Sequence, residues 1–287
     1  SDILIPWYKS IKTLKDLVET IKSRQAKYVL KPIDSRGSRG VIRINNSSEC
    51  DHAFQYSMSF SDSKQLILEE WIDGHQLSSE SIVLRNKAYL CGLADRNYDR
   101  LDELYPYVVE DGGQTPSKFA NDKLELKVDK LMTEVCELVN LEEGSIKGDL
   151  ILKGDDLYLI EFAARLSGGY FATHTIPLVY DYDIVKNVIQ IALGELPDLP
   201  SRPLDVKKYQ CNRFFFIPQG TIKKISGKPK ASEDIVDFQL YVSEGDKIEK
   251  ITNHTMRVGT VLTAASTPSK ALSLAFETIK DLKFEMI

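Results

Sequence analysis

Residues 145–169 read SIKGDLILKGDDLYLIEFAARLSGG and carry the strongest signal in this sequence. Two apolar runs, residues 145–152 and 157–163, flank a polar Lys-Gly-Asp-Asp turn, a pattern typical of a β-hairpin. Opposite residues in a hairpin keep a constant sum of residue numbers. A three-residue or bulged loop therefore places Asp149 directly opposite Glu161, on one face of the hairpin. A two-residue loop would offset the pair by one position.

Two carboxylates on one face of a hairpin repel each other unless something neutralises them. Mg²⁺ would do so, because it prefers carboxylate oxygens that it shares with substrate phosphates. Arg165 follows Glu161 by four positions and could contact a transferring phosphate from the same face. The segment Ser167-Gly168-Gly169 then provides a flexible turn. The alternative interpretation is two solvated acids on an exposed hairpin.

A lysine and a glycine-rich loop lie upstream of this hairpin. Residues 28–32, Tyr-Val-Leu-Lys-Pro, read as a strand, and the loop Ser35-Arg36-Gly37-Ser38-Arg39-Gly40 follows it. Lys31 offers a mobile positive charge, and glycine lets backbone N–H groups approach phosphate oxygens. The Walker A pattern is absent. The candidates for phosphate binding are Lys31, Ser35, Arg36, Gly37, Ser38 and Gly40. The alternative is an ordinary hairpin turn beside an exposed lysine.

A third candidate segment lies between the lysine and the paired acids. Residues 65–71 read as a strand that runs into Glu69-Glu70-Trp71-Ile72 and ends at Asp73-Gly74. Such a segment can offer one backbone C=O and one N–H to an adenine edge, while Trp71 and Ile72 wall the base. The alternative is a strand end with solvated acids.

Taken in this order, the three motifs resemble those of the ATP-grasp superfamily. The resemblance covers about residues 5–195. The tail, with residues 216–220 and Arg257-Val258-Gly259, looks like the C-terminal module of biotin carboxylase and related carboxylate–amine ligases. The resemblance implies an α+β ATP-grasp fold, in which two α+β lobes clamp ATP. It implies a lid subdomain over residues 1–68, a core with the metal site over 69–200, and a small β-rich C-terminal module over 201–287.

The same resemblance assigns roles to the candidate residues. Lys31 would contact the ATP phosphates beneath a lid formed by residues 35–40, and residues 69–72 would read adenine. Asp149 and Glu161 would bind Mg²⁺, with Mn²⁺ as the alternative, and Arg165 would stabilise an acyl phosphate. The implied activity is an ATP- and Mg²⁺-dependent, ADP-forming ligase that activates a carboxylate for attack by an amine or another nucleophile. The alternative is a non-catalytic nucleotide-binding subunit or a regulatory ATP-grasp module.

The sequence departs from the family pattern at three points. Gln76 stands where an acid usually holds the ribose hydroxyls, and an amide lacks the charge that assists those bonds. Ala163 stands where an asparagine often completes the metal site. Family members also usually carry an N-terminal α/β domain and a first phosphate lysine before the point at which this sequence starts. We therefore expect nucleotide binding, with weaker contacts at the ribose and the metal.

Bulk composition narrows the class of protein. The 287 residues are 43% hydrophobic and carry a net charge of −5, which gives no electrostatic case for nucleic acid as a partner. No apolar run approaches the roughly 18 residues of a membrane span. The four cysteines lie far apart without metal-ligand spacing, which is typical of reduced thiols. We expect a cytoplasmic enzyme that acts on small-molecule carboxylate and amine substrates, with a homodimer as the candidate assembly.

Overall fold

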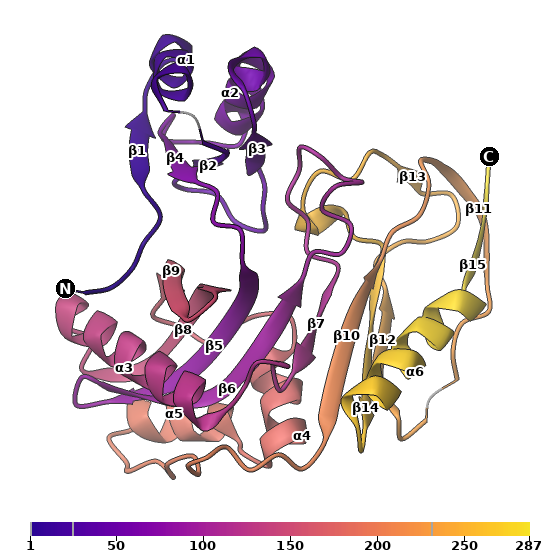
Figure 1. The fold of residues 1–287 in the computed structure, drawn as a ribbon. Coiled ribbons are helices and arrows are strands. Elements are labelled where there is room, and N and C mark those ends of the chain that lie inside the picture. The colour runs from indigo at the N-terminus through magenta and orange to yellow at the C-terminus, as the bar shows by residue number, and fades with distance from the viewer. Residues whose placement is uncertain (1, 25, 231) are drawn as a thin grey trace.

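The chain forms two lobes of mixed α and β structure in a computed structural model that describes residues 2–24, 26–230 and 232–287 (Figure 1). The smaller lobe is a four-stranded antiparallel sheet in the order β1-β4-β2-β3, with α1 and α2 packed on it. Its elements are β1 (Tyr8–Ile11), α1 (Leu14–Ser23), β2 (Tyr28–Pro32), β3 (Ile42–Ile44), η1 (Ser47–Glu49), α2 (Cys50–Ser59) and β4 (Leu66–Glu70). Helix α1 begins where the Thr13 side chain accepts a hydrogen bond from the Asp16 N–H, as in other N-capped helices.

The larger lobe is built on one eight-stranded antiparallel sheet in the order β12-β14-β10-β7-β6-β5-β8-β9. Its first part contains β5 (His75–Leu84), β6 (Lys87–Asn97), β7 (Gly112–Thr115), α3 (Asp122–Val139), β8 (Glu143–Lys153) and β9 (Asp156–Ala163). The π-helical η2 (Phe171–Thr175), α4 (Ile176–Tyr180) and α5 (Ile184–Ala192) follow. Helices α3, α4 and α5 share one apolar core with β5, β6 and β8.

The C-terminal residues complete the same large sheet. Strands β10 (Tyr209–Phe215), β12 (Ile235–Leu240) and β14 (Gly259–Ala265) join it through β7, and α6 (Pro268–Asp281) packs on β10 and β14. Strands β11 (Gly220–Ser226), β13 (Lys247–Ile248) and β15 (Lys283–Met286) form a separate three-stranded sheet, and η3 (His254–Met256) precedes β14. In the described part of the chain, none of the helices has the length and apolar composition needed to cross a membrane.

In the hairpin of β8 and β9, a bulge that could not be read from the sequence brings Asp149 and Glu161 opposite each other. Its turn has only two residues between Lys153 and Asp156, which alone would offset the acids. A bulge at Ile160 on β9 changes the register, so Leu150 pairs with Leu159 while Asp149 pairs with Glu161. A bulge adds one residue to one strand and turns the neighbouring side chains. The expected face-to-face arrangement therefore holds, although the two-residue loop by itself would have prevented it.

Close backbone packing shapes the middle of the large sheet. Strand β7 begins with Gly112 and Gly113 and lies between β6 and β10. A Cβ atom would stand 2.3 Å from the Asn212 O at Gly112 and 2.6 Å from the Asp95 O at Gly113, so glycine is needed for the close approach of β6 and β10. Asp181 ends α4 in the left-handed conformation, and α5 begins at Ile184, where the Asp183 side chain accepts a hydrogen bond from the Lys186 N–H.

The smaller lobe contacts the rest of the chain at more places than the connection between β4 and β5. The Gly37 C=O in the glycine loop accepts a hydrogen bond from the His254 N–H at 3.0 Å, and the Tyr56 hydroxyl donates to the Thr252 C=O at 3.2 Å. Ile251 also joins the apolar core of the smaller lobe. The segment around η3 thus contacts the lobe that would act as a lid.

Candidate active site

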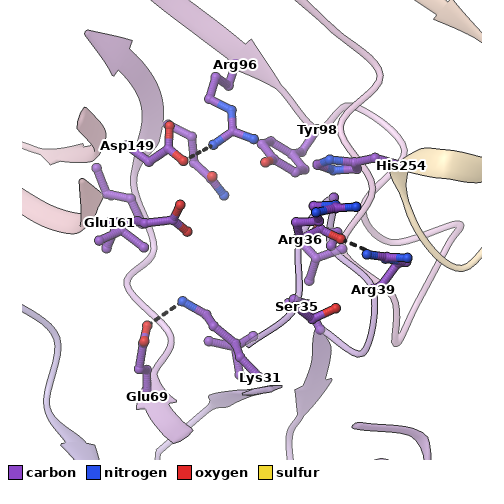
Figure 2. A pocket seen from close by; sticks show the side chains of 18 of the residues that line it. Lys31, Ser35, Arg36, Arg39, Glu69, Arg96, Tyr98, Asp149, Glu161 and His254 are labelled. Carbon is purple, nitrogen blue, oxygen red and sulfur yellow. Dashed lines mark hydrogen bonds and ion pairs between the residues drawn. The ribbon is translucent and has the colours of Figure 1, made fainter. Parts of the chain in front are cut away.

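A cleft of about 520 Å³ lies between the lobes, and most of the sequence-predicted site residues line it (Figure 2). Those residues are Lys31, Ser35, Arg36, Gly37, Ser38, Glu69, Glu70, Trp71, Ile72, Gln76, Asp149, Glu161 and Arg165. Gly40 is not among the lining residues. It has a φ of +76°, and a Cβ there would stand 2.5 Å from the Pro32 side chain, so Gly40 shapes the end of the loop.

Positive charge dominates the lining of this cleft. It contains seven cationic side chains, from Lys31, Arg36, Arg39, Arg96, Lys147, Arg165 and Arg257, and four carboxylates, from Glu69, Glu70, Asp149 and Glu161. The cleft therefore has an excess of three positive charges in a chain whose net charge is −5. A low-dielectric cleft of one sign concentrates ligands of the opposite sign. A polyanion such as a nucleoside triphosphate fits this charge distribution.

The paired acids differ in their surroundings. Asp149 Oδ2 lies 2.8 Å from Lys147 Nζ and 3.2 Å from an Arg96 nitrogen, and its side chain is 15% exposed. Burial acts to raise the pKa of Asp149, but the Arg96 and Lys147 charges outweigh it and hold that pKa below its usual range. Glu161 is exposed and points into the cleft opposite Asp149. One acid is thus held ionised by neighbours, and the other is free to meet a ligand.

The donor set fits a metal that is shared with substrate phosphates. The residues that the structure describes contain no group of three or more His, Cys, Asp or Glu side chains that could hold a metal ion. Mg²⁺ usually binds through one or two carboxylates and completes its shell with phosphate oxygens and water. Asp149 and Glu161 on facing strands match that requirement.

One ion-paired lysine and several free backbone amides lie at the opposite end of the cleft. Lys31 Nζ, on β2, lies 2.5 Å from Glu69 Oε2 on β4, and this ion pair would have to exchange for a phosphate contact. Within the described ranges, the backbone N–H groups of residues 35–38 donate to no acceptor. Successive free amides on a turn form a concave site for anions. The loop therefore offers backbone donors next to a movable ammonium group.

The segment between the lobes has one free amide at the position expected for adenine recognition. The Glu70 N–H donates to the Trp7 C=O and the Trp71 N–H to the Lys27 C=O, both at 2.9 Å. No partner for the Ile72 N–H occurs among residues 2–24, 26–230 and 232–287. Ile72, and not its two predecessors, thus has a backbone donor available to a base.

A half-buried network that the sequence only partly indicated completes the cleft. Glu110 accepts from Arg96 at 3.0 Å, and Arg257 donates to the Glu110 C=O at 2.7 and 3.0 Å. The His254 Nε2 accepts from the Glu110 N–H at 3.1 Å. Burial and the charges of Arg257 and Arg96 hold the pKa of His254 well below its usual range, so the ring is neutral. The sequence offered Arg257 only as part of a motif in the tail. Glu110 and His254 were missed.

Comparison with known proteins agrees with this geometry. Residues 7–169 match the family model described as ATP-grasp domain, and residues 213–286 match the model described as L-amino acid ligase C-terminal domain 2. Because the first match covers more than half of the residues, the chain belongs to the ATP-grasp family, whose fold the two lobes adopt.

Solved structures show the same fold at low sequence identity. An L-amino acid ligase from Bacillus licheniformis aligns with a TM-score of 0.79 and 17% identity, covering 99% of this chain and 68% of its own. Phosphoribosylglycinamide synthetase from Anaerococcus prevotii gives 0.66 and 17%, covering 100% and 71%. The biotin carboxylase domain of Hydrogenobacter thermophilus 2-oxoglutarate carboxylase, a dimer in complex with MgADP, ADP and bicarbonate, gives 0.70 and 16%, covering 98% and 63%.

One curated relative matches along nearly the whole chain. The uncharacterized protein y4rH from Sinorhizobium fredii is 21% identical over 291 residues, which cover 98% of this chain and 58% of that protein. The chain thus spans less than two thirds of the length of this relative.

Proposed function

We propose that this chain carries out the ATP-dependent activation of a carboxylate for attack by an amine. The observation that carries the proposal is the pairing of Asp149 with Glu161 in a positively charged cleft that also holds Lys31 and Arg165. Relatives in the ATP-grasp family bind ATP or ADP with Mg²⁺, as the carboxylase complex illustrates. When bound between the two acids, Mg²⁺ would offset the charge of the β- and γ-phosphates.

Residues of the chain itself would bind the nucleotide and stabilise the transferring group. Lys31 and the amides of residues 35–38 would hold the phosphates, while the Ile72 N–H would contact adenine. A carboxylate oxygen attacks the γ-phosphorus and the bond to the β-phosphate oxygen breaks, which gives an acyl phosphate and ADP. The amine then attacks the acyl carbon, loses a proton, and phosphate leaves. Arg165 would offset charge on the transferring group in both steps.

A side chamber next to the cleft suits the carboxylate substrate. It has a volume of about 220 Å³ and shares Arg96, Lys147, Asp149 and Arg257 with the cleft. Phe171, Phe214, the carboxylates Asp95 and Glu110, and several amide and hydroxyl side chains form its other walls. Arg96 and Arg257 carry the planar donors that carboxylates prefer, and a bound acid would compete with Glu110 and Asp149 for them.

ADP release tests the proposal. The protein at its full natural length should form ADP from MgATP only with a suitable acid, and hydroxylamine should trap the acyl phosphate as a hydroxamate. A panel of amino acids and short carboxylic acids supplies the substrates. Nucleotide binding without ADP or hydroxamate would contradict the proposal. That outcome would favour a non-catalytic nucleotide-binding module, for which the existing ion pairs of Asp149 with Arg96 and Lys147 are the specific argument.

Gln76 gives a test of the nucleotide site itself. It lies on β5 opposite Ile151, on the cleft-facing side of the sheet. An amide offers one acceptor to the ribose diol, whereas a carboxylate accepts from both hydroxyls with charge assistance. A charge-assisted bond adds about 1 kcal/mol or slightly more, so Gln76→Glu should tighten ATP binding up to roughly tenfold.

Titrations with ATP and 2′-deoxy-ATP measure this effect. The mutant should also discriminate more strongly against the deoxynucleotide, and Gln76→Ala serves as the control that removes both hydrogen-bonding groups. Equal affinities of wild type and Gln76→Glu for both nucleotides would show that residue 76 does not face the ribose.

A further inference from the structure

A buried acid lies beneath the loop that carries Arg165. Glu80, in the middle of β5, is fully buried, and its Oε2 accepts a hydrogen bond from the Ser167 N–H at 2.7 Å. Ser167 belongs to the segment 164–169 between β9 and η2, which contributes Arg165, Gly168 and Gly169 to the cleft. The two residues are 87 positions apart in sequence. The bond thus joins the central strand of the sheet to the edge of the cleft.

This bond is the main polar attachment of the segment. Its other hydrogen bonds are local, from the Arg165 N–H to the Ala163 C=O and from the Arg165 guanidinium to the Leu166 C=O. Within the described ranges, the one other hydrogen bond to a strand or helix joins the Gly168 C=O to the Phe171 N–H at 3.4 Å, at the start of the adjoining η2, so Glu80 is the one hydrogen-bond partner distant in sequence. A Cβ atom at Gly168 or Gly169 would meet nothing within 4 Å, so packing does not fix the backbone there. Leu166 packs against the core of the larger lobe, and the bond to Glu80 is the polar contact that fixes the segment from a strand distant in sequence.

The surroundings of Glu80 include few charges. Lys147 lies opposite it on β8, and Arg165 faces it from the segment itself. Cys91 approaches from β6, and burial raises the pKa of that thiol to about 12, so it stays neutral. Burial raises the pKa of Glu80 to about 7, although the hydrogen bond from the Ser167 N–H and the charges of Lys147 and Arg165 act in the opposite direction. The second carboxylate oxygen, Oε1, is buried without a partner in the described chain.

We propose that Glu80 is a positioning residue for the ligase reaction, and that its ionised carboxylate holds segment 164–169 so that Arg165 faces the transferring phosphate. The inference rests on the function proposed above. An ionised acceptor binds an N–H more strongly than a neutral one. The segment should therefore loosen when Glu80 becomes protonated, without a change in the groups that bind adenine or ribose.

The pH dependence follows from the direction of the pKa shift. Turnover should fall as the pH decreases through about 7, because the carboxylate then loses its charge. Stability should change in the opposite sense. The folded-state pKa lies above the ordinary value of 4.5, so this group contributes stability below that value and the contribution is lost as the pH rises through about 7.

Two substitutions and a matched control test the proposal. Glu80→Ala removes the acceptor and should lower kcat about 10- to 100-fold, with the KM for ATP within roughly twofold. Glu80→Gln keeps the shape and an acceptor but cannot ionise, so its kcat should lose the wild-type dependence between pH 6 and 8.5. The control is Glu125→Gln on α3, another buried carboxylate that accepts from a backbone amide, that of Leu204 at 3.4 Å. It should keep the wild-type profile.

Hydrogen exchange gives a reading that does not require turnover. Amides of residues 164–169 should exchange faster in Glu80→Ala than in wild type, and at the wild-type rate in Glu125→Gln. Unchanged exchange in Glu80→Ala, or a Glu80→Gln profile identical to the wild-type profile in an active enzyme, would overturn the positioning role. Faster exchange in a protein without turnover would support the role of Glu80 in holding the segment and count against the ligase function alone.

Discussion

Glu161→Gln should lower Mg²⁺-dependent ADP formation by about 1,000-fold while the protein stays folded. The expected loss follows from the charge that the proposed metal contributes at the transferring phosphate, which is worth several kcal/mol. Glu161 is the cleaner of the two acids to change, because its carboxylate is exposed and makes no ion pair within the described residues. Isothermal titration with MgADP and a coupled ADP assay would measure binding and turnover separately.

Asp149→Asn should abolish turnover to a similar degree, but it also leaves Arg96 and Lys147 without their shared partner. Part of its effect will therefore appear as lower stability, since a buried charge that loses its partner is costly. Asp156→Asn is the matched control, because it removes an exposed carboxylate from the turn of the same hairpin. Wild-type turnover in the double mutant Asp149→Asn, Glu161→Gln would show that the metal is held elsewhere.

Site residues that interact with near neighbours in the sequence could be predicted, whereas contacts between residues far apart in the sequence could not. The strand periodicity and the Gly-Asp turn were sufficient to predict the hairpin of β8 and β9. The bulge at Ile160, which sets the final register, depends on how β9 ends at the edge of the sheet and has no local signature. Lys147 stands two positions before Asp149, so its place on the same face was available from the period of a strand.

The contacts that could not be foreseen act across the fold. Glu110 meets His254 over a separation of 144 positions, and Glu80 meets Ser167 over 87. Such contacts follow from the strand order of the large sheet, in which β10 joins β7 next to β6. The residues next to Glu80 also give no sequence pattern that marks it as a buried acid with a special role. Residues 79–83 are all buried, because this part of β5 is covered on both faces, and a covered strand gives no alternation from which to read a special acid.

Arg165→Ala should reduce kcat by about 100- to 1,000-fold, with a KM for ATP that changes by no more than a few-fold. Removal of one donor that stabilises developing charge in a transition state typically has an effect of this size. The structure favours a role in the reaction over a role in folding. The side chain is exposed, and its one hydrogen bond in the described chain goes from the guanidinium to the neighbouring Leu166 C=O at 3.0 Å. Most of its donors therefore remain free for a ligand.

Arg165→Lys separates the contribution of the positive charge to the rate from the contribution of the planar hydrogen-bond donors. An ammonium group keeps the positive charge but cannot make two parallel hydrogen bonds to a phosphate, so it should recover part of the lost rate, roughly tenfold over Arg165→Ala. Arg85→Ala is the control, since Arg85 is an exposed arginine at the turn between β5 and β6. Single-turnover measurement of acyl phosphate formation would locate the defect in the first step. Full activity in Arg165→Ala would mean that another cation, Lys31 or Arg257, contacts the transferring phosphate. Lys31 would then be the better candidate, because the Arg257 guanidinium already donates to the Glu110 C=O.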